Sequence, residues 1–181
     1  MSSNLKIVID SKAIAQRVRE LGAAISDHYR AEPLIMVCVL KGAFIFFADL
    51  VRAVSIEPEL DFVRLASYGN QTMRKERILF NKDMELPVAG KHVLVVDDIV
   101  DTGHSVHYLL NVLAMRGARS LRVCALVDKR ERRQVEVVVD FPGFVLSSGF
   151  VVGYGLDHAE RYRHLSAVHE LMDNATMPQS T

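Results

Sequence analysis

Three carboxylates lie within five positions near the middle of the chain, at Asp97, Asp98 and Asp101. They follow the apolar run 93–96, whose mostly β-branched residues are typical of a strand buried on both faces. An amphipathic helical stretch comes next, and it opens with Thr102, Gly103, His104 and Ser105. The pattern predicts a polar loop between a buried strand and a helix, at the sheet edge where open α/β folds bind ligands.

The chemistry expected at this loop is the binding of a phosphorylated ligand. Unpaired backbone amides at a helix start, together with the helix dipole, favour a phosphate at residues 102–105. Carboxylates beside a phosphate need partners of their own, and a divalent cation or sugar hydroxyls would supply them.

Two other interpretations of the same segment stay open. The first is an ordinary buried strand that ends in a solvated acidic turn, although three acids so close together argue against it. The second is a receiver-type phosphorylation domain, because such domains also begin with an apolar run and two aspartates. Asp140 would then be the phosphoacceptor, but too little chain follows residue 93 for a whole receiver, and residues 1–92 would have no role.

Composition narrows the class of protein. The 181 residues suffice for one domain, and half of them are apolar. Lys+Arg and Asp+Glu balance at 22 each, so bulk charge gives no reason to expect nucleic-acid or membrane partners. The longest apolar runs are too short for a membrane span, and the first residues carry no secretory signal. Cys38 and Cys124 lie in apolar runs without zinc spacing, so we expect a cytoplasmic protein.

Hydrophobic periodicity predicts an α/β fold with a mainly parallel, doubly wound sheet flanked by helices. We expect a helix capped by Asp10 or Ser11, and further helices over 43–53 and 104–116, the last ended by Gly117. Strands are expected at 34–40, 60–65, 93–97, 121–127, 135–139 and 150–154. Residues 68–90 are expected to form a long mobile loop with a short hairpin. A single domain results, with a core over about 5–130 and a hood over about 131–170, to which the N-terminus could contribute. We expect the tail, 172–181, to be disordered.

The segment 93–105 resembles the phosphoribosyl pyrophosphate (PRPP) binding motif of the type I phosphoribosyltransferases. That motif has several apolar residues, two acidic residues, two apolar residues and then Asp-Thr/Ser-Gly. Asp97 departs from it, because purine-salvage members usually carry Glu there. The resemblance implies that Asp97 and Asp98 hold ribose hydroxyls or Mg²⁺. It also implies that Asp101 handles a proton of the purine and that the loop from Asp101 to Ser105 takes the 5′-phosphate.

Two further segments are ambiguous by themselves and gain meaning from this resemblance. Lys41-Gly42 follows a strand and could be a plain turn; in the family such a loop binds pyrophosphate, with a non-proline cis peptide between the two residues. Ser67 and Tyr68 could simply end a strand. They resemble the Ser-Tyr pair that the family carries on a lid, which keeps water from the reacting sugar.

The side expected to bind the base follows two later strands. Lys129 could belong to a solvated run of charges; the resemblance implies that it donates to the 6-oxo group of a purine, which favours oxo-purines over adenine. Residues 150–157 could be an edge strand with a glycine bulge. They resemble the purine-binding segment of hypoxanthine-guanine phosphoribosyltransferases, in which Phe150 would stack on the base, the Val151 backbone would read its edge, and Asp157 would lie near the exocyclic group and the metal. Residues 147–149 depart from that family's pattern.

Arg163 completes the resemblance, which runs from about residue 34 to 165, and its role would be to clamp pyrophosphate. The implied activity is Mg²⁺-dependent conversion of hypoxanthine or guanine with PRPP into IMP or GMP and pyrophosphate. The alternatives are a xanthine-preferring enzyme and a PRPP-sensing regulator of the same fold. The expected partners are these small molecules and further copies of the chain, in a dimer or tetramer to which the helix 43–53 could contribute.

Overall fold

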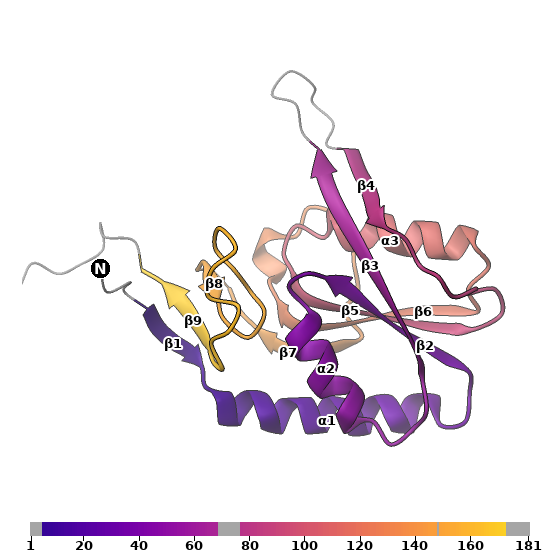
Figure 1. Ribbon diagram of the computed structural model, residues 1–181, viewed down its shortest axis with the longest axis horizontal. Helices are drawn as coiled ribbons and strands as arrows, with labels where there is room; N and C mark the ends of the chain where they lie inside the picture. Colours follow the sequence, from indigo (N-terminus) through magenta and orange to yellow (C-terminus); the bar gives the residue numbers. More distant parts are fainter. Residues whose placement is uncertain (1–4, 69–76, 148, 173–181) are drawn as a thin grey trace, which may run out of the picture.

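The computed structural model describes residues 5–68, 77–147 and 149–172, and its centre is a six-stranded sheet. The strand order is β4-β3-β2-β5-β6-β7 (Figure 1). All neighbours are parallel except β3 and β4, which are antiparallel. The strands are β2 (Leu34–Leu40), β3 (Glu59–Tyr68), β4 (Arg77–Lys82), β5 (His92–Val100), β6 (Ser120–Asp128) and β7 (Phe141–Val145). The predicted α/β fold with a mainly parallel sheet is therefore confirmed.

Helices cover both faces of this sheet. α1 (Ser11–Tyr29) and α2 (Phe44–Ala53) pack on one face, and α3 (His104–Met115) packs on the other; η1 (Arg130–Arg132) is a short 3₁₀ turn. The central strands alternate accordingly: Met36 and Cys38 of β2 contribute to the core under α1 and α2, whereas Ile35 and Val37 lie in the core under α3. Asp10 caps α1 by accepting the backbone N–H groups of Lys12 and Ala13, as predicted.

A second, antiparallel sheet forms the hood, in the order β1 (Leu5–Ile9), β9 (Val168–Leu171) and β8 (Val151–Val152). The N-terminal strand and the C-terminal strand pair here, beside the main sheet (Figure 1). The N-terminal contribution to the hood, left open from sequence, is thus present. Met172 ends the described chain, and the rest of the expected disordered tail lies outside the described residues.

The predicted boundary of the core at residue 130 is wrong, because β7 adds a sixth strand as far as Val145. The predicted strand over 135–139 is also absent, since this segment packs against the loop before α3 and β7 takes the free edge of β6. Pro142 and Gly143 made β7 look like a turn, but an edge strand tolerates proline. Arg17 of α1 donates to the carbonyls of Pro142 and Gly143, at 2.7 and 3.0 Å, and so gives both acceptors a partner.

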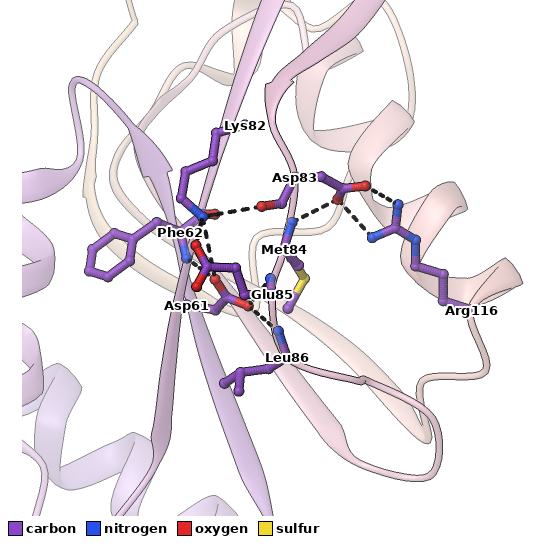
Figure 2. Close-up of polar contacts among 8 residues, drawn as sticks. All are labelled: Asp61, Phe62, Lys82, Asp83, Met84, Glu85, Leu86 and Arg116. Carbon is purple, nitrogen blue, oxygen red and sulfur yellow. Dashed lines mark hydrogen bonds and ion pairs between the residues drawn. The ribbon is translucent and has the colours of Figure 1, made fainter.

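The stem of the β3–β4 hairpin is anchored by a buried carboxylate (Figure 2). Asp61 of β3 is 3% exposed and accepts the backbone N–H groups of Phe62, Glu85 and Leu86 at 2.7–2.8 Å. The segment after β4 is therefore ordered by this contact, and Val88 within it is buried. The expectation of a mobile loop without core residues over 68–90 is therefore wrong for residues 85–88.

No helix in the described part of the chain is long and apolar enough to cross a membrane.

Candidate active site at the carboxyl edge of the sheet

The acidic pair lies inside the sheet, because β5 continues to Val100 rather than ending at residue 97 as predicted. Asp97 is only 6% exposed, and its Oδ1 accepts the backbone N–H of Asp98 at 3.0 Å. Burial, and then the proximity of Asp98, raises the pKa of Asp97 well above its usual value; burial also raises the pKa of Asp98. A solvated acidic turn is therefore excluded, and the two carboxylates form a site that favours a cation or hydroxyl donors.

The loop after β5 forms a small hollow of about 110 Å³, whose lining residues include Asp97, Asp101, Thr102, Gly103 and Ser105. Gly103 precedes α3 with φ of 89°, a left-handed conformation that favours glycine. Asp101 faces two environments: its Oδ2 lies 3.0 Å from Nη1 of Arg132, while its Oδ1 is buried without a hydrogen-bond partner in the described structure. An unpartnered buried acceptor of this kind suits a group that receives a proton from a ligand.

Arg133 binds the backbone at the start of this loop. Its guanidinium donates to the carbonyls of Asp101, Val100 and Val137 at 3.1, 3.3 and 2.6 Å. Its Nη2 also lies 2.6 Å from Oδ1 of Asp128, at the end of β6. Sequence reasoning missed Arg132 and Arg133; the only local signal was the basic run that begins at Lys129, which looked like solvated surface.

Two glycines bring the neighbouring loops into close contact. A Cβ on Gly42 would lie 1.7 Å from Oδ2 of Asp98, and a Cβ on Gly155 would lie 2.1 Å from the carbonyl oxygen of Gly42. Only glycine permits these approaches, so the Lys41-Gly42 loop is held between the acidic pair and the hood. The cis peptide bond joins Leu40 to Lys41, one position before the predicted bond between Lys41 and Gly42. The residue pattern indicated the loop but did not locate the bond within it.

The two predicted pyrophosphate cations meet at one acidic side chain, which sequence reasoning also missed. Nζ of Lys41 lies 2.9 Å from Oε1 of Glu160, and Nη2 of Arg163 lies 3.2 Å from Oε2 of the same carboxylate. Nη2 of Arg163 also lies 2.7 Å from Oδ1 of Asp157. Hydrogen bonds from Lys41 and Arg163 hold the pKa of Glu160 below its usual value. No spacing in the sequence signals a pair of residues 119 positions apart.

Phe150, one of the predicted base-binding residues, lines a hollow of about 540 Å³ at the hood, together with Gly149, His158 and Glu170 among others. Lys129 is 3% exposed rather than part of a solvated run, and burial lowers its pKa. Its Nζ donates to the carbonyl oxygen of Gly149 at 2.6 Å, which holds the ammonium near this hollow.

Phe150 is 51% exposed and meets the His158 ring edge to face, with 5.3 Å between the ring centroids. Val151 lies in β8, an edge strand of the hood sheet, so one row of backbone groups faces away from β9. A flat exposed ring, a free row of backbone groups and a buried ammonium can together bind a planar heterocycle that carries an oxo group.

The predicted lid falls at the limit of the described structure. Ser67 and Tyr68 are the last residues of β3, opposite Ile78 and Arg77 of β4. The rest of the predicted lid, Gly69 included, lies outside the described residues. In the described part of the chain, no three His, Cys, Asp or Glu side chains converge on one point as metal ligands.

The receiver alternative is wrong. Asp140 accepts the backbone N–H of Val123 at 2.9 Å near the start of β6 and also binds Arg122. It therefore lies toward the opposite end of the strands from Asp97, where a phosphoacceptor could not meet the acidic pair.

An acidic pair, a loop suited to a phosphate and two cations lie at one edge of a parallel sheet, as expected for an α/β enzyme that acts on a phosphorylated ligand. The family described as phosphoribosyl transferase domain matches residues 4–159, and the chain belongs to this family.

Among individual relatives, the hypoxanthine phosphoribosyltransferase of Salmonella typhimurium is 40% identical over 176 residues, which cover 95% of this chain and 98% of that protein. A hypoxanthine-guanine phosphoribosyltransferase from Bacillus anthracis superposes with a TM-score of 0.88 at 36% identity, covering 92% of this chain and 98% of that one. A hypoxanthine-guanine-xanthine phosphoribosyltransferase superposes with a TM-score of 0.84 at 34% identity, covering 93% of this chain and 97% of that one.

Proposed function

We propose that this protein transfers the phosphoribosyl group of PRPP to hypoxanthine or guanine, yielding IMP or GMP and pyrophosphate. The observation that carries the proposal is the buried Lys129, whose ammonium donates to the carbonyl oxygen of Gly149, the residue directly before the exposed Phe150. An ammonium donor matches the 6-oxo group of both bases, whereas the 6-amino group of adenine offers it no acceptor. The names of the relatives point to the same bases.

The sugar phosphate would bind across the carboxyl edge of the sheet. The backbone N–H groups of residues 102–105 would hold the 5′-phosphate at the start of α3, with Arg133 keeping the preceding backbone in place. Lys41 and Arg163 would neutralise the leaving pyrophosphate. The backbone of Gly42, directly after Lys41, would lie against the same anion.

Mg²⁺ fits the acidic pair. The carboxylates of Asp97 and Asp98 are adjacent, the first buried and the second half-buried, and their raised pKa values mean that ionising both is unfavourable until a cation joins them. The absence of a third convergent ligand in the described chain suits Mg²⁺, which binds to one or two carboxylates and completes its shell with water and phosphate oxygens. The ion would neutralise charge on the pyrophosphate; Asp157 stays a predicted ligand.

In the transfer itself, N9 of the purine forms a bond to C1 of the ribose while the bond from C1 to the pyrophosphate oxygen breaks. Positive charge develops on the sugar, and the acidic pair would stabilise that charge. The purine must lose the proton on N7, and the unpartnered Oδ1 of Asp101 would accept it. Ser67 and Tyr68 would close over the site and exclude water.

The test is nucleotide formation from Mg²⁺, PRPP and each of hypoxanthine, guanine, xanthine and adenine in parallel. We expect product from the first two and none from adenine. Equal or faster use of xanthine would show a xanthine-preferring enzyme instead. PRPP binding without product from any base would show a PRPP-sensing regulator.

We also propose that the chain acts in the cytoplasm as a homo-oligomer, a dimer or tetramer. Phe44 of α2 and Leu60 and Phe62 of β3 support the second point, because these apolar side chains are 45%, 40% and 37% exposed. Light scattering on the purified protein would give the mass directly, and a monomer would contradict the proposal.

A further inference from the structure

The Glu160 carboxylate occupies a position that an anionic ligand would be expected to take. It bridges Lys41 and Arg163, with one oxygen 2.9 Å from Nζ and the other 3.2 Å from Nη2. These are the two cations assigned to pyrophosphate under the proposed function. A carboxylate and a phosphate present similar oxygens to ammonium and guanidinium donors, so the two anions would compete for the same hydrogen bonds.

Glu160 is held there by its backbone. It lies in the tight turn from His158 to Arg161, whose ends exchange hydrogen bonds at 3.1 and 3.2 Å. The two central residues, Ala159 and Glu160, both have positive φ, 51° and 63°, in a turn that normally prefers glycine or asparagine. The backbone N–H of Glu160 also donates to Oδ2 of Asp157 at 2.9 Å. A less favourable backbone is thus kept at the residue whose side chain meets the cations.

The ion pairs are nevertheless weak enough to exchange. The side chains of Lys41 and Glu160 are 45% and 64% exposed, and exposed pairs contribute little net stability. A multiply charged ligand that binds both cations would therefore displace Glu160, and Asp157 would remain in contact with the same Nη2 of Arg163.

We propose that Glu160 is a built-in competitor of pyrophosphate, which holds Lys41 and Arg163 in place in the empty site and is displaced when phosphate oxygens bind. The inference rests on the proposed function, because it takes these two cations to be the pyrophosphate site. Its consequence is weaker binding and faster release of the leaving group than the two cations alone would give.

The test compares pyrophosphate affinity, in the presence of Mg²⁺, of the wild type and the Glu160→Gln variant by titration calorimetry. We expect affinity for pyrophosphate and PRPP to rise about two- to fivefold, the range for a modest competing ion pair, while the KM for the base stays unchanged. Glu57→Gln is the matched control, because it removes the same charge between α2 and β3, at the amino end of that strand and away from the site. It should leave pyrophosphate binding as in the wild type.

Unchanged or weaker pyrophosphate binding by Glu160→Gln would overturn the inference, since weaker binding would mean that Glu160 only positions the cations. Lys41→Met separates this result from a failure of the proposed function. If Lys41→Met weakens pyrophosphate binding and Glu160→Gln does not strengthen it, the cation site stands and the competitor is refuted. If Lys41→Met has no effect either, both assignments fall.

Discussion

Arg133 and Asp128 form a buried ion pair, 2.6 Å between Nη2 and Oδ1, that ties the end of β6 to the loop after β5. The side chain of Asp128 is 4% exposed and that of Arg133 is 15% exposed. Because the same guanidinium donates to the carbonyls of Val100 and Asp101, the pair determines where the proposed phosphate loop begins.

Arg133→Met should therefore lower the free energy of unfolding by about 3–5 kcal/mol, because the carbonyls of Val100, Asp101 and Val137 lose their charged donor and Asp128 keeps only its exposed partner. Urea unfolding measures the change. Arg130→Met is a matched control, because Arg130 pairs with the same Asp128 at 2.8 Å but is 66% exposed. Its loss should be at most about 1 kcal/mol; equal losses in the two variants would contradict the assignment.

Asp101→Asn should reduce turnover by roughly 10²–10⁴-fold, as expected when an acid–base group is lost. PRPP binding should change little, because the backbone of residues 102–105 carries the predicted phosphate contacts. Steady-state kinetics and PRPP titration measure the two quantities separately. Wild-type turnover in this variant would remove Asp101 from its proposed role.

Lys129→Met should raise the KM for hypoxanthine by about 10–100-fold, the value of one hydrogen bond to a charged donor. The KM for PRPP should stay close to that of the wild type, since Lys129 lies on the hood side of the site. The exposed neighbour Arg130, replaced by Met, again serves as the control. An equal increase in both KM values would mean that Lys129 supports the site as a whole.

Asp97→Asn should stabilise the ligand-free protein at neutral pH while reducing transfer activity. Burial raises the pKa of Asp97 in the folded chain, so the folded state holds this proton more tightly than the unfolded state does. The folded protein therefore loses stability as the pH rises from the pKa of Asp97 in the unfolded chain, about 4, to its raised pKa in the folded chain. Above that raised pKa, the full cost of ionising the buried carboxyl is present. The asparagine avoids this cost and can still accept the N–H of Asp98.

Thermal unfolding at pH 7 measures this effect, and we expect a rise in Tm of about 2–4 °C, the shift for about 1 kcal/mol in a chain of this size. The difference should shrink at a pH below the unfolded value. Asp27→Asn, at a side chain 83% exposed, should leave the Tm unchanged. A lower Tm for Asp97→Asn would show that the carboxylate is stabilising as it stands.

The amino-acid sequence by itself determined the central strands, their order of appearance and the polar loop that follows β5. Apolar runs such as 34–40 and 121–127 favour strands that are buried on both faces, between two layers of helices. This preference depends on the residues of the run itself, so the sequence records it. The helix α1 followed from its spacing of apolar residues, and its cap followed from Asp10, for the same reason.

Tertiary structure alone decided which distant segments meet. The Phe141–Val145 strand contains Pro and Gly and became a strand because β6 offered it a free edge and Arg17 bound its carbonyls. β1 joined the hood because β9 returns beside it. Glu160 reaches Lys41 only because Gly42 and Gly155 let their backbones touch. Such contacts depend on how the whole chain closes on itself, and no local pattern of residue types records that.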